Sequence, residues 1–557
     1  MKSLSRRGTL AGLSGFTGIV ALSGTAAARG LGDGVFTHGV ASGDPTTNAV
    51  IIWTRFVPKV AVPGPVRWQV ARDEAFSRII AQGVAQATPE TDYCIKVDAT
   101  GLAPGQRYFY RFLSRSGPSV TGLTRTAPER GREPLTIAGF ACSMLPAGYF
   151  RAYADAATRD DIDLCAHVGD YIYEYGDELR QFAPNMLPER TWEPKTEIIT
   201  YADYARRYAS YRADPDLQEL HRVKPFVHVW DDHEFTNDAW REGAQNHQPL
   251  TEGPWMPRRD AAAKAWFDWL PVRPQPGQPR RIHHTLKWGD LAHLIMLDSR
   301  LMRDKQPDSW QSLLNNFVDG DRARFDREAL RLWQDEIGAP TRTVLGSDQE
   351  TWLASQLKAS RDAGTNWQVL IEGSVLGRFQ MPRQSETWLA PDASANEKKA
   401  RRILAQVGEL GLPFDTPLWS GFPAARERLL ASCKANGSNV FAFGGETHIG
   451  WAFNLPGGPD GPAAVEIACT AVTSSNSFRP DGFDDVSREA AFIEASPELA
   501  WCDVHHWGYT SVRFEAKAAT ADFTGFRSVS ARNTPVAKRS QLVAETTKVG
   551  VRPWIVS

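Results

Sequence analysis

Four short apolar segments of this chain are each followed at once by a cluster of polar side chains. The segments are LTIAGF, IDLCAHV, PFVHVW and NVFAF, and the clusters are Ala141-Cys142-Ser143, GDYIYEYG from Gly169, WDDHE from Trp230 and GGETH from Gly444. Each segment has the length and β-rich composition of a buried strand. Because a parallel or mixed α/β sheet gathers the carboxyl ends of its strands along one edge, we expect the four clusters to meet there.

The four clusters carry a thiol, carboxylates, a phenol and imidazoles, which is the inventory of a metal site more than of an acid and base pair. In the second cluster Asp170 and Tyr173 stand three residues apart. A tyrosinate is a hard, strongly donating ligand that suits a trivalent cation such as Fe(III). Taken alone, this pair is explained at least as well by an Asp that caps the loop and a Tyr that packs within it.

The third and fourth clusters are stronger signals. Residues 231–234 carry four consecutive polar side chains at the end of an apolar strand. Burying them there costs free energy, which is explained if they have a functional role. The alternative is a salt-bridged helix N-terminus, because Asp favours the first turn. In the last cluster Glu446 and His448 alternate, so their side chains fall on one side of an extended segment.

The organisation of the chain predicts two units. A length of 557 residues exceeds one ordinary domain. Residues 35–127 show alternating runs between Gly, Pro and Asp turns, which predicts an all-β sandwich, and a hairpin within one larger domain is the alternative. The run from Leu102 to Tyr110 in this unit matches a tyrosine corner and resembles a fibronectin type III module. Residues 130–525 alternate strands with amphipathic helices, which predicts an α/β domain, and residues 526–557 are expected to be a C-terminal tail.

Residues 1–28 have the pattern of an export signal. Lys2, Arg6 and Arg7 precede an uncharged apolar stretch over residues 10–22, and small residues follow it. The stretch is shorter than the ~20 residues that a membrane-spanning helix needs. The start resembles a twin-arginine signal, although Thr9 stands where an aromatic residue is common, so the general secretory route stays open. We therefore expect a periplasmic or secreted protein that uses the twin-arginine export machinery.

The charge balance argues against an extended basic surface. Lys plus Arg number 63 and Asp plus Glu 65, which gives a net charge of −2. We therefore expect no stable nucleic-acid or membrane partner, and any phosphate group must be held locally. The six cysteines show no CxxC pairing and are too few for a disulfide framework in a chain of this length.

In this order the four clusters are similar to those of the PhoD-type alkaline phosphatases and phosphodiesterases, a branch of the calcineurin-like metallophosphoesterases. Further matches are LDSR at Leu297, LGSDQETWL at Leu345 and DTPLWSGFPAARERLL at Asp415. The resemblance implies a metallophosphatase-type α/β/β/α sandwich behind the all-β unit. It also implies a metal-dependent hydrolase that acts on phosphate esters.

The resemblance also implies a site with one Fe(III) and at least one Ca²⁺. Asp170 would bridge the metal ions. The remaining iron ligands would be Cys142, Tyr173 and His448.

The calcium ligands implied by the resemblance are Asp232 and Glu446, whose oxygen atoms suit a hard cation. Relatives usually carry Asp where this chain has Glu446, and two Asn after the DDHE box where this chain has Asn237 and Asp238. Asp231 and Asn237 are the candidate residues for a second calcium ion or for an outer contact to the first, and the sequence leaves the number of calcium ions open.

The catalytic residues implied by the resemblance are His233 and Asp170. His233 would hydrogen-bond the phosphoryl group or protonate the leaving oxygen. Arg300, in LDSR, is a candidate phosphate contact, with an ion pair to Asp298 as the alternative reading of this arginine. The implied reaction is hydrolysis of phosphate mono- and diesters, in which a hydroxide or oxide held between the metal ions attacks phosphorus.

Other functions stay open at this point. A dedicated phosphodiesterase for nucleic acid, teichoic acid or phospholipid headgroups would keep the same site, although no basic run with interleaved aromatics supports nucleic acid. A non-catalytic surface protein would be expected to have lost some of the ligands that this chain retains. A serine hydrolase would need a GxSxG sequence near an apolar strand, and none is present there.

Overall fold

The computed structural model of the protein describes residues 30–556, except 62, 182–185, 279, 460, 476–477, 480–485 and 548–549. The predicted export signal, residues 1–28, lies outside the described residues. No helix in the described part of the chain is both long and apolar enough to cross a membrane.

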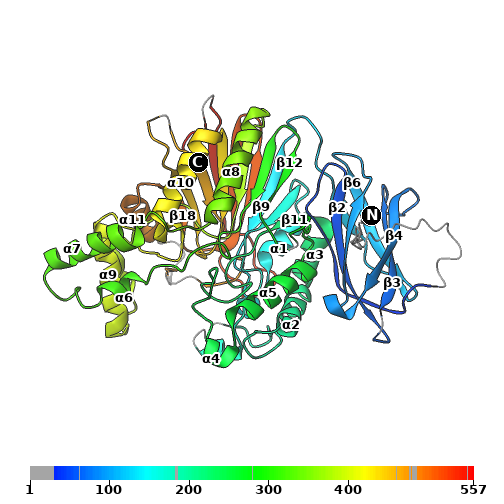
Figure 1. The fold of residues 1–557 in the computed structure, drawn as a ribbon, viewed down its shortest axis with the longest axis horizontal. Helices are drawn as coiled ribbons and strands as arrows, with labels where there is room; N and C mark the ends of the chain where they lie inside the picture. The colour runs from blue at the N-terminus through cyan, green and yellow to red at the C-terminus, as the bar shows by residue number, and fades with distance from the viewer. Residues whose placement is uncertain are drawn as a thin grey trace, which may run out of the picture.

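Two large β-sheets form the centre of the molecule (Figure 1). The strands of the ten-stranded sheet, in sheet order, are β22 (Ile555–Val556), β21 (Lys538–Glu545), β20 (Ala518–Phe526), β19 (Trp507–Phe514), β9 (Leu135–Phe140), β10 (Leu164–His167), β11 (Pro225–His228), β1 (Gly34–Gly43), β2 (Ala49–Pro58) and β5 (Cys94–Thr100). Those of the seven-stranded sheet are β12 (His284–Trp288), β13 (Ala292–Met296), β14 (Trp367–Ile371), β15 (Asn439–Gly444), β17 (Ala464–Ala468), β16 (Gly450–Leu455) and β18 (Leu499–Asp503).

Helices cover the outer faces of both sheets (Figure 1). Those against the ten-stranded sheet are α1 (Arg151–Ala157), α2 (Tyr201–Arg212), α3 (Pro215–Val223) and α5 (Trp255–Trp269), and those against the seven-stranded sheet are α8 (Gly346–Asp362) and α10 (Pro423–Asn436). The side chains of β15 alternate between the two faces of its sheet, which explains this layering. Phe441 and Phe443 join the core between the sheets. Val440 and Ala442 pack with α8 and α10 on the other face. The predicted α/β/β/α sandwich is confirmed.

The N-terminal unit shares a sheet with the rest of the protein. β1 runs parallel to β11, with Ser42 opposite Pro225, so β1, β2 and β5 continue the ten-stranded sheet. The second sheet of the unit consists of β3 (Gly64–Ala71), β4 (Ile79–Ala87), β6 (Arg107–Ser114), β7 (Gly117–Pro118) and β8 (Gly122–Arg125). Its Tyr108 hydroxyl accepts a hydrogen bond from the backbone N–H of Ala103 at 2.7 Å, which is the contact expected at a tyrosine corner.

Residues 526–557, expected to be a tail, are part of the sheet and of the core. β21 pairs with β20 from Lys538 opposite Gly525 to Glu545 opposite Ala518. Trp554 is 6% exposed, and its indole N–H donates to the carbonyl oxygen of Glu466 at 3.2 Å. Most of the chain end is therefore folded structure, because β20 offers an unpaired edge that β21 covers.

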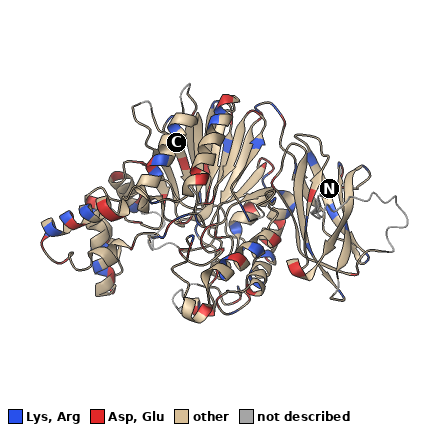
Figure 2. Ribbon diagram, viewed as in Figure 1, with Lys and Arg blue, Asp and Glu red and all other residues tan. Residues whose placement is uncertain are grey.

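A smaller group of helices lies at one end of the molecule (Figure 1). It contains α6 (Trp310–Leu314), α7 (Arg322–Leu332) and α9 (Ala395–Glu409), which share an apolar core around Trp310 and Phe325. Arg residues are interspersed with Asp and Glu along α7 (Figure 2), whereas α6 carries no charged side chain. The remaining helices are α4 (Pro249–Glu252) and α11 (Ser487–Ala495).

Candidate metal centre

The four polar clusters meet at the carboxyl ends of β9, β10, β11 and β15. The first three strands are neighbours in the ten-stranded sheet, and β15 lies in the facing sheet. Backbone hydrogen bonds join the first two clusters, because the N–H of Cys142 donates to the carbonyl of Gly169 at 3.2 Å and that of Ser143 to the carbonyl of Asp170 at 2.8 Å. The four predicted strands and the convergence of their clusters are confirmed, but the strands belong to two facing sheets and not to one sheet as expected.

The residues expected to bind iron lie together. One donor atom each from Cys142, Asp170 and His448 falls within 4.8 Å of the others. The phenol of Tyr173 donates to Oδ2 of Asp170 at 3.0 Å and lies 3.3 Å from Nε2 of His448. The set offers sulfur, oxygen and nitrogen donors around one point.

The residues expected to bind calcium adjoin the same carboxylate. Donor atoms of Asp170, Asp231, Asp232 and Glu446 lie within 4.8 Å of one another, and so do those of Asp170, Asp232 and His233. Asp170 therefore belongs to all of these groups. Its Oδ1 atom is buried and has no hydrogen-bond partner among the described residues.

Four of these residues adopt a backbone conformation that side chains other than glycine seldom adopt. The φ angles are 58° at Cys142, 54° at Asp170, 68° at Glu446 and 62° at His448. Each such residue costs on the order of 1–3 kcal/mol unless its surroundings hold it there. These left-handed turns fall directly after the strands, at the residues whose side chains converge.

Glu234 connects the loops after β10 and β11. Its buried carboxylate accepts backbone hydrogen bonds from Asp170 at 3.0 Å, Tyr171 at 2.7 Å and Asp231 at 2.8 Å. Gly169 allows the close approach of these loops, because a Cβ atom there would lie 2.4 Å from the Cβ of Asp231.

His233 is held by Glu174, a residue that the sequence analysis did not single out. Nδ1 of His233 lies 2.7 Å from Oε2 of Glu174. The other oxygen of Glu174 accepts from Thr236 at 3.0 Å and from the backbone N–H of Asn237 at 2.8 Å. The sequence offered one signal for Glu174, its position inside the second polar cluster. A fully buried carboxylate there needs hydrogen-bond or ion-pair partners.

The two site histidines have opposite electrostatic surroundings. Burial disfavours the charged form of His233, but Asp232, Glu174 and Asp170 outweigh it and raise the pKa of His233 well above its usual value. Burial lowers the pKa of His448 to about 4, so its imidazole is neutral, the form that binds a metal ion. His448 donates from Nδ1 to a backbone carbonyl at 2.7 Å, which directs Nε2 to the site.

Arg300 forms different contacts from those expected. Its guanidinium is fully buried, pairs with Asp231 and lies 2.6 Å from Glu446. Asp298 instead accepts a hydrogen bond from the indole of Trp230 at 3.1 Å. The alternative of an ion pair between Arg300 and Asp298 is therefore wrong, and a contact of Arg300 with phosphate stays a prediction.

The residues expected near a second calcium ion have protein partners. Asp231 pairs with Arg300. Asn237 accepts from the phenol of Tyr175 at 3.2 Å and donates to Gln245 at 3.0 Å. A second calcium ion at this position stays a prediction.

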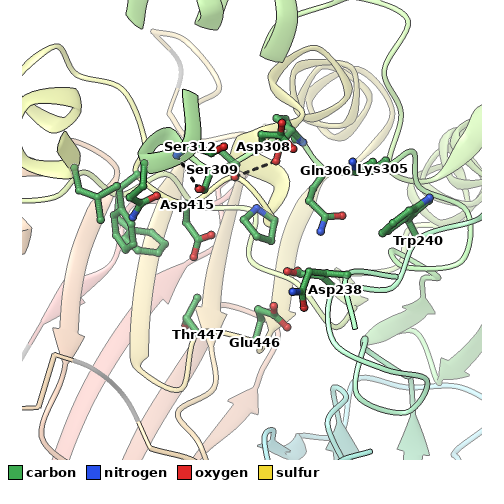
Figure 3. Close-up of a pocket in the computed structure, with 18 of the residues that line it drawn as sticks. Asp238, Trp240, Lys305, Gln306, Asp308, Ser309, Ser312, Asp415, Glu446 and Thr447 are labelled. Carbon is green, nitrogen blue, oxygen red and sulfur yellow. Dashed lines mark hydrogen bonds between the residues drawn. The ribbon is translucent and has the colours of Figure 1, made fainter. Parts of the chain in front are cut away.

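A cavity of about 860 Å³ adjoins the metal centre (Figure 3). Asp238, Glu446 and Thr447 line it on the side of the candidate ligands, and Asp415 projects into it from another segment. A substrate that reaches the cluster has space to extend into this cavity.

Comparisons with known proteins agree with this geometry. The PhoD-like phosphatase family matches residues 137–523, and the N-terminal domain of PhoD-like phosphatases matches residues 23–128. Alkaline phosphatase D of Bacillus subtilis (strain 168) is 30% identical over 536 residues, which cover 93% of this chain and 82% of that protein. A solved structure of PhoD has a TM-score of 0.72 and 27% identity, and covers 94% of this chain and 92% of its own. The resemblance inferred from the four clusters is confirmed, and the chain is an enzyme of the PhoD-like phosphatase family.

Proposed function

We propose that this phosphatase hydrolyses phosphate mono- and diesters outside the cytoplasm and that it requires Fe(III) and Ca²⁺. The observation that carries the proposal is the convergence of the four clusters on Asp170, which belongs to every candidate metal group. A shared carboxylate is the arrangement that holds two cations close together.

The donor set fits both ions. Cys142, Tyr173 and His448 offer a thiol, a phenol and an imidazole, and the phenolate in particular favours ferric iron. Asp232 and Glu446 offer oxygen atoms alone, which suit calcium. The orphaned Oδ1 atom of Asp170 is a buried acceptor that a cation would satisfy.

His233 is the proposed proton donor to the leaving oxygen. Its Nδ1–H is directed to Glu174, while Nε2 makes no hydrogen bond within the described residues and the side chain is 8% exposed. General acid catalysis of this kind contributes roughly 10²- to 10⁴-fold. When bound, the two ions would supply Lewis-acid activation of water and of the phosphoryl oxygens.

Metal analysis and the visible spectrum of the pure protein test the iron assignment. We expect stoichiometric iron and a ligand-to-metal absorption band that disappears in Tyr173→Phe, and we expect Cys142→Ala to lose iron. Tyr175→Phe is the matched control, since its ring also packs on His233 but Tyr175 contributes no atom to the donor set. A colourless, iron-free and fully active enzyme would refute the assignment.

The range of esters is tested with p-nitrophenyl phosphate and bis(p-nitrophenyl) phosphate. We expect turnover of both. Negligible turnover of the monoester would favour the dedicated phosphodiesterase.

Export is proposed from residues 1–28. Replacing Arg6 and Arg7 together by Lys should abolish export through the twin-arginine machinery and leave the precursor inside the cell. Continued export and cleavage would instead indicate the general secretory route.

A further inference from the structure

We propose that the cavity beside the metal centre receives the leaving group of the substrate and selects an alcohol that carries an ammonium group. Phosphate esters of amino alcohols are then the preferred substrates. This inference rests on the proposed function and adds which ester the site prefers.

The cavity is placed to receive a leaving group. Glu446 belongs to the candidate calcium group and also lines the cavity. On the same side, the backbone N–H of Asp238 donates to Oδ2 of Asp232 at 2.5 Å. An ester whose phosphoryl group lies at the cluster therefore has its alcohol directed into the space that Figure 3 shows.

Asp415 places a carboxyl group without a direct ion-pair partner in this space. Its carboxylate projects into the cavity (Figure 3) and forms no ion pair or side-chain hydrogen bond with any described residue. Burial, followed by the repulsion of Asp238, raises the pKa of Asp415 to about 7. Arg300 and Arg303 act in the opposite direction, but Arg300 pairs with Asp231 and Glu446, and Arg303 lies 3.9 Å from Asp238. A cation between these carboxylates would relieve the repulsion, whereas an anionic leaving group would increase it.

Aromatic rings line the same cavity, among them that of Phe414, which precedes Asp415 in the chain. Phe379 lies 5.0 Å from Phe414 and 4.7 Å from Trp451, and Phe414 lies 5.8 Å from Phe478, measured between ring centroids. All four rings line the cavity. Aromatic faces attract organic cations, and quaternary ammonium groups are bound in this way.

The basic side chains of the cavity do not neutralise Asp415. Lys305 lies with Trp240 at the other end of the cavity (Figure 3), with its Nζ atom 5.9 Å from that ring. The guanidinium of Arg401 lies 5.2 Å from the ring of Phe478, and it donates to the carbonyl of Ser385 at 3.4 Å. The part of the cavity around Asp415 is therefore acidic and aromatic.

The reaction is ordinary ester hydrolysis. The P–O bond to the amino alcohol breaks, a water oxygen bonds to phosphorus, and a proton ends on the leaving oxygen.

Two esters of the same shape test the proposal. Phosphocholine carries a quaternary nitrogen where 3,3-dimethylbutyl phosphate carries a neutral carbon. We expect kcat/KM to favour phosphocholine by about tenfold or more. Asp415→Asn should bring the ratio close to one by lowering kcat/KM for phosphocholine far more than for 3,3-dimethylbutyl phosphate, and Phe414→Leu should reduce the ratio.

Asp308→Asn is the matched control, because Asp308 lines the same cavity but is exposed to solvent. It should leave the ratio as in the wild type. Equal kcat/KM for the two esters in the wild type would overturn the proposal, and so would an equal loss for both esters in a folded Asp415→Asn. Hydrolysis of p-nitrophenyl phosphate distinguishes a failure of the substrate preference from a failure of the proposed function. If the wild type does not hydrolyse this ester, the proposed function itself fails.

Discussion

The guanidinium of Arg300 lies 2.6 Å from the carboxylate of Glu446 and pairs at the same time with Asp231. Arg300 is fully buried, and both carboxylates belong to the candidate calcium group. The chain therefore places a cation of its own among the oxygen donors. This arrangement limits the repulsion between carboxylates that would otherwise oppose folding.

Replacing Arg300 by Met should destabilise the protein by about 3–5 kcal/mol in the presence of a chelator, because it leaves the buried carboxylate of Asp231 and the partly buried one of Glu446 without their partner. Part of this loss should be recovered on adding Ca²⁺, since a bound cation again separates Asp231 and Glu446. Urea unfolding with and without calcium measures both effects.

Arg331→Met is the matched control for Arg300→Met. Arg331 pairs with Glu328 at 2.7 Å on the exposed side of α7, where solvent screens the pair so that it contributes little to stability. If Arg300→Met proved as stable as this control, the buried pairing would not stabilise the fold.

Replacing Glu174 by Gln should weaken proton donation by His233. The substitution removes the negative charge 2.7 Å from Nδ1, so the pKa of His233 falls and its protonated form becomes rarer. We expect kcat for an alkyl phosphate to fall by roughly 10²-fold, and that for p-nitrophenyl phosphate by much less, because p-nitrophenolate leaves without a proton.

Steady-state kinetics on the two leaving groups check this expectation, with Glu189→Gln as an exposed control in the same part of the chain. A uniform loss for both substrates would show instead that Glu174 acts by holding the loop.

Much of the centre could be predicted because its signals are local. The strand that ends at Phe140 and the one that begins at Asn439 are short apolar runs, and the polar residues after them are costly to bury without a use. Clusters that follow neighbouring strands of one sheet converge at its edge, as those after β9, β10 and β11 do, whereas the cluster after β15 joins them from the facing sheet.

The contacts that could not be predicted join segments that are far apart in the sequence. Nothing local in Arg300 indicates that it pairs with Glu446 and not with Asp298, because that choice depends on the order of strands in the seven-stranded sheet, where Arg300 follows β13 and Glu446 follows β15. The pairing of Ser42 with Pro225 is of the same kind, since β1 carries no signal for its parallel partner. The strands β21 and β22 within residues 526–557 were not predicted, because polar strands at a sheet edge show only a weak alternation of apolar and polar residues.

Replacing Trp554 by Ala should destabilise the protein by about 3–5 kcal/mol, although it lies three residues from the end of the chain. Its ring is 6% exposed and lies 6.0 Å from that of Phe441 in the core between the sheets. The neighbouring Ile555, 56% exposed, is the control, and Ile555→Ala should change the free energy of unfolding by less than about 0.5 kcal/mol. Similar values for the two variants would show that the chain end does not contribute to the core.

The contribution of three buried histidines to the stability of the protein should fall as the pH falls below 6.5, because they are neutral in the folded state. Burial lowers the pKa of His167 from 6.5 to about 3 and those of His221 and His228 well below 6.5. Between 6.5 and about 3 the unfolded chain therefore binds more protons than the folded one, and each histidine contributes a slope of about 1.4 kcal/mol per pH unit.

His228→Phe isolates one of these contributions. Neither ring nitrogen of His228 has a hydrogen-bond partner among the residues described, and the ring stacks on Phe226 at 5.1 Å, so a phenyl ring can take its place. Unfolding free energies measured from pH 7 to pH 4 should show the slope reduced by about 1.4 kcal/mol per pH unit. Phe226→Leu changes the packing but no titrating group, so it should lower stability at every pH and leave the slope unchanged. A His228→Phe protein with the wild-type slope would mean that His228 is already charged in the folded state.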